Sequence, residues 1–179
     1  FLYAANKADG RNAADGRDKA YIRKIDGRTG TVAWTKTFDA SAENAGGAYA
    51  PVHIGKNELN GTIIASLSAA ALNDGTDGGL IIGLDKSTGE EKWRVEQADG
   101  IWSAPVVIYD ENGKGYILQC DRGGKLTLYS GIDGQAMCSI DLGSRIESTP
   151  AVFNNTLVVG TRGVDGSGQG PKIVGIRIG

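Results

Sequence analysis

Short apolar runs separated by glycine-rich turns repeat along the whole chain. Residues 62–66, 115–119 and 156–160 are such runs. Between the runs stand clusters such as Asn73-Asp74-Gly75 and Arg122-Gly123-Gly124, and glycine adopts the positive φ angles of tight turns without steric cost. No segment shows the periodicity of an amphipathic helix. The pattern predicts an all-β protein of short strands, typical of a sandwich, barrel or propeller.

Three segments of the chain repeat one motif. Residues 25–34 and 84–93 both read apolar-Asp-x-x-Thr-Gly-x-x-x-Trp, and residues 129–138 are a third copy with Ser130 for the Asp and Cys138 for the Trp. Asp and Thr side chains bond turn amides, so each copy predicts a tight turn between two strands. The residues expected to hold these turns and junctions are Asp26, Thr29, Gly30, Trp34, Asp85, Thr88, Gly89 and Trp93.

A proline begins the strand that follows each motif. Pro51, Pro105 and Pro150 each open an apolar run, and the first residue of a strand is where proline is tolerated. The 45 positions from Pro105 to Pro150 equal the spacing from Gly89 to Gly134. A repeat of about 40–50 residues with four strands is typical of a β-propeller.

The repeat predicts fourteen strands in the order BCD-ABCD-ABCD-ABC, with strand A innermost in each four-stranded antiparallel blade. These strands make about 3.5 blades, and the expected blade parts are residues 1–39, 48–97, 103–141 and 148–179 of a single segment, 1–179. Because a ring must bury its edges, we expect this segment to belong to a larger ring. Either further blades of the same parent chain or a second copy would complete it.

Composition and charge narrow the range of partners. The net charge is −2, with 22% charged residues, which gives no basic face for nucleic acid. No apolar run approaches the roughly 20 residues of a membrane span. We expect neither a nucleic-acid partner nor a spanning segment.

The Asp-x-x-Thr-Gly-x-x-x-Trp segments resemble the tryptophan-docking repeat of quinoprotein-type (PQQ-like) β-propellers, over essentially the whole chain. The resemblance implies that Trp34 and Trp93 pack between neighbouring blades, and that Cys138 leaves a less tightly packed junction. It is to the non-catalytic branch of the family, which includes the lipoprotein propeller of outer-membrane protein assembly. That branch implies an extracytoplasmic location, in the periplasm or at the cell surface.

The resemblance leaves two functions open. The first is a non-catalytic scaffold that binds a protein, peptide or glycan; the alternative is part of a PQQ- and calcium-dependent quinoprotein dehydrogenase. The cofactor enzymes of the family commonly carry a vicinal Cys-Cys pair, whereas Cys120 and Cys138 are 18 positions apart. We therefore expect no PQQ and no catalytic residue, and an enzyme remains the less favoured interpretation.

The two cysteines are expected to be free thiols. Cys120 ends strand B and Cys138 lies in strand D of the same blade. Two strands of spacing put them about 9.6 Å apart, beyond the roughly 7 Å that a disulfide allows between Cα atoms.

The B–C and D–A links share one face of the ring and are expected to carry the function. The B–C links at residues 7–19, 68–79 and 162–171 are long, and long loops on a rigid sheet often bind partners. Trp102 and Glu147 stand just before strand A, with Ala48 as the expected third equivalent. The candidate partner-binding residues are Trp102, Glu147 and Tyr49.

Acidic residues of the long loops are the candidate calcium ligands, because hard cations prefer oxygen. They are Asp9, Asp15, Asp74 and Asp77. No loop has the full spacing of a calcium-binding loop, and a solvated insertion is the other interpretation of these loops. His53, the only histidine, is expected at the place of Val107 and Val152 in strand A, as a packed side chain or as a ligand or base.

Overall fold

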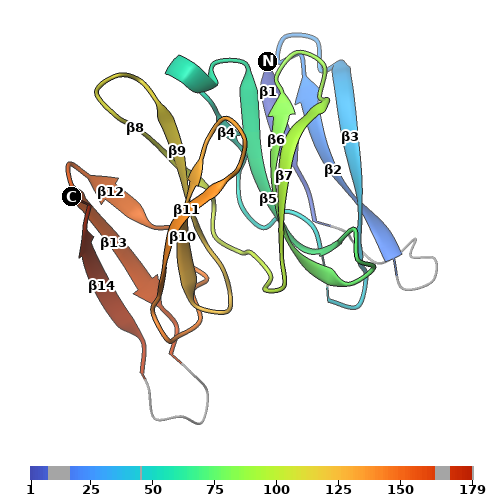
Figure 1. Cartoon of the computed structure of the whole chain (residues 1–179). Helices are drawn as coiled ribbons and strands as arrows, with labels where there is room; N and C mark the ends of the chain where they lie inside the picture. The colour runs from blue at the N-terminus through green and yellow to red at the C-terminus, as the bar shows by residue number, and fades with distance from the viewer. Residues whose placement is uncertain (8–16, 45, 164–169, 179) are drawn as a thin grey trace.

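The structure is a computed structural model that describes residues 1–7, 17–44, 46–163 and 170–178. The described residues form fourteen strands and one short 3₁₀ helix, η1 (Asn57–Leu59). The strands build twisted antiparallel sheets that lie side by side in chain order (Figure 1). This is the all-β propeller architecture that the repeat predicts, with the strands in the expected order.

The strands form three sheets, of seven, four and three strands, and the seven-stranded sheet contains two repeats that share the single pair of Ala40 with Ala70. We call the four repeats blades. Blade 1 contains β1 (Leu2–Ala5), β2 (Arg17–Ile25) and β3 (Val32–Ser41). Blade 2 contains β4 (His53–Ile54), β5 (Thr62–Ala71), β6 (Asp77–Asp85) and β7 (Glu91–Gln97). Blade 3 contains β8 (Val106–Tyr109), β9 (Gly115–Cys120), β10 (Lys125–Ser130) and β11 (Ala136–Asp141). Blade 4 contains β12 (Ala151–Phe153), β13 (Thr156–Thr161) and β14 (Lys172–Arg177).

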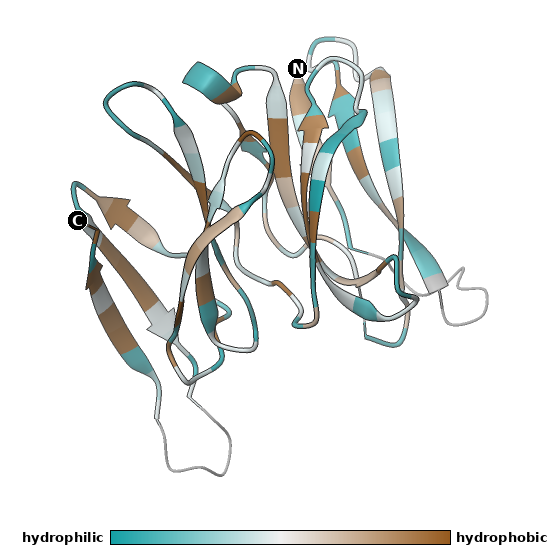
Figure 2. Ribbon diagram, viewed as in Figure 1, coloured by the Kyte–Doolittle hydropathy of each residue, from teal (hydrophilic) through white to brown (hydrophobic). Residues whose placement is uncertain are grey.

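The hydrophobic core lies between the blades, as three clusters. Ile22 and Leu67 belong to the cluster between blades 1 and 2, and Ile64 belongs to the cluster between blades 2 and 3. Leu118 and Leu157 belong to the cluster between blades 3 and 4. Successive strand residues point to opposite faces, so a blade with neighbours on both sides needs apolar residues at consecutive positions. Figure 2 shows hydrophobic segments, interrupted by paler and polar ones, along these strands.

The repeated motif forms the same turn in both full copies. Asp85 accepts hydrogen bonds from the amides of Ser87 at 2.7 Å and Thr88 at 2.9 Å, and Gly89 has a φ of 76°. These amides hold the pKa of Asp85 below its ordinary value. Asp26 accepts the two equivalent amides at 2.8 and 3.2 Å. The same bonds within the motif therefore shape both turns.

Each tryptophan of strand D lies on the turn of the next blade. The Trp34 indole donates to the carbonyl of Lys86 at 3.3 Å, and a Cβ added at Gly89 would lie 2.7 Å from its ring. A Cβ added at Gly134 would likewise lie 2.8 Å from the Trp93 ring. Glycine at these turns leaves room for the indole, which packs one blade against the next.

The junction between blades 3 and 4 is packed differently. Cys138 pairs with Leu128, whereas Trp93 pairs with Gly83 in the preceding blade. A smaller strand-D residue is thus partly offset by a larger strand-C residue. An apolar cavity of about 280 Å³ borders Cys138 at this junction, which is the looser packing that the sequence predicts. Cys120 is buried, Cys138 is exposed, and both are free thiols.

The prediction of a long loop at residues 68–79 is wrong. β5 continues to Ala71 and β6 begins at Asp77, which leaves only the turn 72–76 between them. Ala70 pairs with both Gly78 and Ala40. Small side chains at these positions allow three backbones to approach, so residues with the composition of a loop extend the hairpin instead.

Within the described ranges, no helix has the length and apolar character needed to cross a membrane.

Candidate partner-binding site

The pairing of strands A and B fixes which residues are equivalent from blade to blade. The equivalent A–B pairs are Ile54 with Ile63, Val107 with Ile117, and Val152 with Leu157. Five residues before these strand-A positions stand Tyr49, Trp102 and Glu147. Tyr49 is thus the third equivalent, and the assignment to Ala48 is wrong because blade 2 has one more residue between its proline and its strand-A pair.

The same extra residue changes the place of His53. His53 pairs with Ile64 and is equivalent to Val106 and Ala151, rather than to Val107 and Val152. Its Nε2 atom is buried without a hydrogen-bond partner among the described residues. Burial, with a smaller effect of Lys56, lowers the pKa of the imidazole. These features describe a packed neutral side chain.

A repeated backbone hydrogen bond joins the two loops of each blade at the shared face. In blades 2 to 4, a residue at the equivalent position donates its amide to the carbonyl two positions before the Tyr49, Trp102 or Glu147 site. This residue lies inside β5 in blade 2 and shortly after β9 and β13 in blades 3 and 4. These bonds run from Ser68 to Gly47 at 2.9 Å, from Arg122 to Gly100 at 2.9 Å, and from Arg162 to Arg145 at 2.8 Å. Side chains from both loops are therefore held on one rim, along the lower edge of the molecule in Figure 1.

These side chains form a continuous line of contacts. The Lys7 ammonium lies 5.1 Å from the Tyr49 ring centroid, and Tyr49 stacks on Trp102 with centroids 4.9 Å apart. The Arg122 guanidinium lies 4.0 Å from the Trp102 ring, and its Nε donates to Glu147 at 3.3 Å. We refer to these residues, with the two further arginines on Glu147, as the loop-face row. The row consists of Lys7, Tyr49, Trp102, Arg122, Arg145, Glu147 and Arg162.

The charged end of the row is centred on Glu147. Arg122 and Arg162 each lie 3.3 Å from its Oε1 atom, and Arg145 lies 3.9 Å away. The Glu147 side chain is 20% exposed, whereas that of Arg162 is 51% exposed. One carboxylate therefore holds three guanidinium groups that remain accessible to solvent.

Ser68 explains why the two aromatic rings touch. It occupies the position that holds Lys7, Arg122 or Arg162 in the other blades, and it is buried. A Cβ added at Gly100 would lie 2.5 Å from its Oγ, so the serine lies beneath the loop that carries Trp102. No basic side chain separates Tyr49 from Trp102 at this point of the row.

A buried polar layer supports the loop of Trp102. The Ser103 hydroxyl donates to the carbonyl of Cys120 at 2.7 Å, and the side-chain Nε2 of Gln119 donates to the Ser103 carbonyl at 3.1 Å. Ser66 donates to the same carbonyl at 3.2 Å. Buried hydrogen-bonded groups of this kind rigidify the backbone they join, so Trp102 is presented from a fixed position.

The candidate calcium ligands do not gather at one place in the described residues. Asp9 and Asp15 lie outside them. Asp74 accepts hydrogen bonds from the amide and hydroxyl of Thr76 at 2.9 and 2.7 Å, and Asp77 begins β6. Within the ranges that the structure describes, no group of three or more His, Cys, Asp and Glu side chains could hold a metal ion. Calcium binding therefore stays a prediction.

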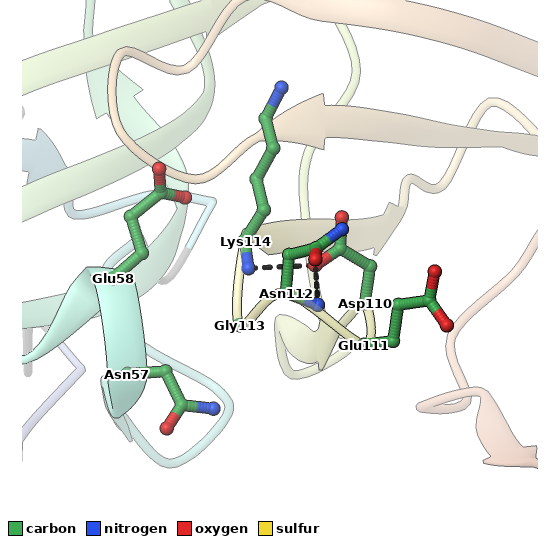
Figure 3. A pocket seen from close by; sticks show the side chains of 7 residues that line it. All are labelled: Asn57, Glu58, Asp110, Glu111, Asn112, Gly113 and Lys114. Carbon is green, nitrogen blue, oxygen red and sulfur yellow. Dashed lines mark hydrogen bonds between the residues drawn. The ribbon is translucent and has the colours of Figure 1, made fainter.

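A groove of about 700 Å³ lies on the opposite face, between η1 and the β8–β9 hairpin (Figure 3). Asp110 turns back to accept the amides of Asn112 and Lys114, both at 2.9 Å, and Glu58 accepts the amide of Gly115 at 2.9 Å. These carboxylates stabilise the local turns. The groove offers no convergent set of groups comparable to the loop-face row.

Comparison with known proteins assigns the chain to a family. A family model described as "Outer membrane protein assembly factor BamB" matches residues 18–112, just over half of the chain. No curated protein matches.

Solved structures show the same fold. BamB from Moraxella catarrhalis has a TM-score of 0.60 at 20% identity, covering 98% of this chain and 43% of that chain. A quinohemoprotein alcohol dehydrogenase from Comamonas testosteroni has a TM-score of 0.58 at 12% identity, covering 83% of this chain and 36% of that one. The computationally designed protein Ika4 has a TM-score of 0.51 at 16% identity, covering 100% and 94%.

The chain thus spans less than half the length of the BamB chain it matches. The sequence match and the propeller fold together show that this chain belongs to the family of the outer membrane protein assembly factor BamB.

Proposed function

We propose that this chain is part of a non-catalytic β-propeller scaffold that binds a protein, peptide or glycan partner through the loop-face row. The observation that carries the proposal is the unbroken line of contacts from Lys7 through Trp102 to Arg162, which crosses all four blades. Tryptophan, tyrosine and arginine are the residues most enriched at the energetic centres of interfaces.

The side chains of the row are also held in place before a partner binds. Trp102 is held on one face by Tyr49 and on the other side by Arg122, and its backbone is supported by the buried bonds of Ser103. A side chain fixed before binding loses less conformational entropy when a partner arrives. Half-buried aromatic and guanidinium groups then offer contact area at low cost.

The proposal extends to the setting of the protein. The family model is named for outer-membrane protein assembly, and the BamB chain is more than twice the length matched here. We propose that the segment, residues 1–179, forms part of a larger ring and acts outside the cytoplasm. The long-loop face of such a ring would then carry the row as one continuous surface around the channel mouth.

A quinoprotein dehydrogenase is the second candidate, supported by the fold similarity to the Comamonas testosteroni enzyme. Two observations support the scaffold over this candidate: no cluster of three potential metal ligands occurs among the described residues, and Cys120 and Cys138 are 18 positions apart. Reduction of an artificial electron acceptor that requires added PQQ and calcium would favour this candidate over the scaffold.

The proposal is tested by capture of partners from a detergent extract of bacterial envelope proteins. Wild type is compared with Trp102→Ala and with Tyr116→Ala, which removes an aromatic ring that contacts Lys114, away from the row. We expect a partner that wild type and Tyr116→Ala retain and that Trp102→Ala loses by about tenfold or more. Identical capture by all three proteins would overturn the proposal.

A further inference from the structure

We infer that the occupant of the row is an acidic polypeptide segment, whose carboxylates bind at Arg122, Arg145 and Arg162. The inference rests on the proposed function and names the chemistry of its partner. It follows from the charge balance at Glu147, from the geometry of Arg122, and from the aromatic pair beside it.

The positive charges around Glu147 outnumber its single negative charge. Among the described residues, each ion pair of Arg122, Arg145 and Arg162 ends on this one carboxylate. Three guanidinium groups around one carboxylate leave an excess of two positive charges. The whole chain carries a net charge of −2, so the excess is a local property of this face.

Two further carboxylates lie close to this end of the row and reduce the excess. Asp121 accepts the amide of Lys125 at 2.9 Å, and burial raises its pKa. Asp99 lies beside the turn, where a Cβ added at Gly123 would meet its carboxylate at 2.3 Å. At this end of the row, three arginines then face three carboxylates, and Lys7 adds a fourth cation beside Tyr49. The described residues of the rim therefore keep an excess of one positive charge.

Arg122 is positioned to receive a carboxylate. The central carbon of its guanidinium lies over the Trp102 ring, 4.0 Å from the centroid, and its Nε donates to Glu147. In the described part of the chain, its two Nη groups have no hydrogen-bond partner. A planar guanidinium fixed in this way can bind an incoming carboxylate through two parallel hydrogen bonds, which lysine cannot do.

The aromatic pair favours a polypeptide that carries both acidic and apolar side chains. Tyr49 and Trp102 form an apolar surface directly beside the guanidinium groups. A ligand that used both parts would carry an acidic residue next to an aromatic or aliphatic one. An extended peptide alternates its side chains and can span successive blades along the row.

The test uses labelled peptides and fluorescence anisotropy. The first probe alternates glutamate and tyrosine, and two matched probes replace glutamate by glutamine or by lysine. The row variant Arg145→Gln/Arg162→Gln is compared with Arg28→Gln/Arg177→Gln, which removes the same charge at exposed residues outside the row. Trp102→Ala is measured in parallel, and every titration is repeated at low and at high salt.

We expect the glutamate peptide to bind wild type and the control variant equally. Binding should weaken about tenfold or more with the glutamine peptide or with the row variant, and it should fall with salt. Tighter binding of the lysine peptide, or equal binding by the row and control variants, would overturn the inference.

The outcomes separate this inference from the proposed function. If Trp102→Ala abolishes binding while peptide charge and row arginines have no effect, the row is a binding site and its acidic preference is wrong. If no peptide binds, and Trp102→Ala also leaves envelope-protein capture unchanged, both fail.

Discussion

Tyr49 and Trp102 stack with ring centroids 4.9 Å apart and an interplanar angle of 17°, although they come from the loops of two different blades. They stand at the same position of successive repeats, and the buried Ser68 leaves the space between them free of a basic side chain. The contact therefore joins two blades at the rim and begins the row that continues through Arg122 to Glu147.

The tryptophans at the rim and in the core should differ in what they stabilise. Trp102 is half-buried, whereas Trp93 is 8% exposed within a core cluster. We expect Trp102→Ala to lower the free energy of unfolding by about 1 kcal/mol and Trp93→Ala by about 3–5 kcal/mol. Urea unfolding followed by circular dichroism measures both. Equal losses would mean that Trp102 is a structural residue rather than a binding one.

Two glycines at equivalent strand positions should differ in how much the same substitution destabilises the protein. A Cβ at Gly83 would lie 2.3 Å from the Trp93 ring, whereas a Cβ at Gly175 would meet nothing within 4 Å. We expect Gly83→Ala to cost about 1–3 kcal/mol by overpacking, and Gly175→Ala to change stability by less than about 0.5 kcal/mol. Thermal unfolding of the two variants tests the docking of Trp93; a tolerated Gly83→Ala would argue against it.

The two thiols should react at very different rates. Burial raises the pKa of Cys120 to about 12, whereas Cys138 is exposed. Because the thiolate is the reactive form, alkylation at pH 8 should modify Cys138 alone in the folded protein and both residues in denaturant. Mass spectrometry of the modified peptides measures this, and rapid modification of Cys120 in the native state would contradict its burial between blades.

Stability should fall at mildly acidic pH because of His53. Its pKa in the folded state lies below the ordinary 6.5 because of burial. Below about pH 6.5 the imidazole of the unfolded chain takes up a proton, while that of the folded chain stays neutral. The contribution of His53 to stability is therefore full above about pH 6.5 and is lost as pH falls towards its pKa in the folded state. Urea midpoints at pH 7.5 and 5.5 should differ less for His53→Val than for wild type. Equal differences would show that His53 is not buried as a neutral side chain.

The features that the sequence predicts well are those with local causes. The Asp26 and Asp85 turns are held by hydrogen bonds within five residues, so the motif alone specifies them. The order of strands follows because these turns recur at a regular spacing. The looser junction at Cys138 also follows, because a missing tryptophan removes volume wherever its partners lie.

The features that were missed depend on contacts between distant segments. Tyr49 was not recognised as the equivalent of Trp102 because one additional residue before β4 shifts the register, which only the pairing of Ile54 with Ile63 reveals. The composition of residues 68–79 predicts a loop rather than the extended hairpin of β5 and β6, because their small residues are used for close approach of backbones.

The sequence contains a signal for the basic residues of the row. A basic residue follows strand B in three of the four repeats, at Lys7, Arg122 and Arg162. Their role depends on where the D–A links bring Trp102 and Glu147, which is a tertiary contact.

The most direct test of the central claim is amide hydrogen exchange of the chain with and without its captured partner. If the loop-face row is the binding surface, exchange should slow in residues 46–49, 98–104, 121–124 and 142–148, and should be unchanged at η1 and in residues 110–114. Slowed exchange at η1 and residues 110–114, with none along the row, would place the partner on the opposite face and contradict the account.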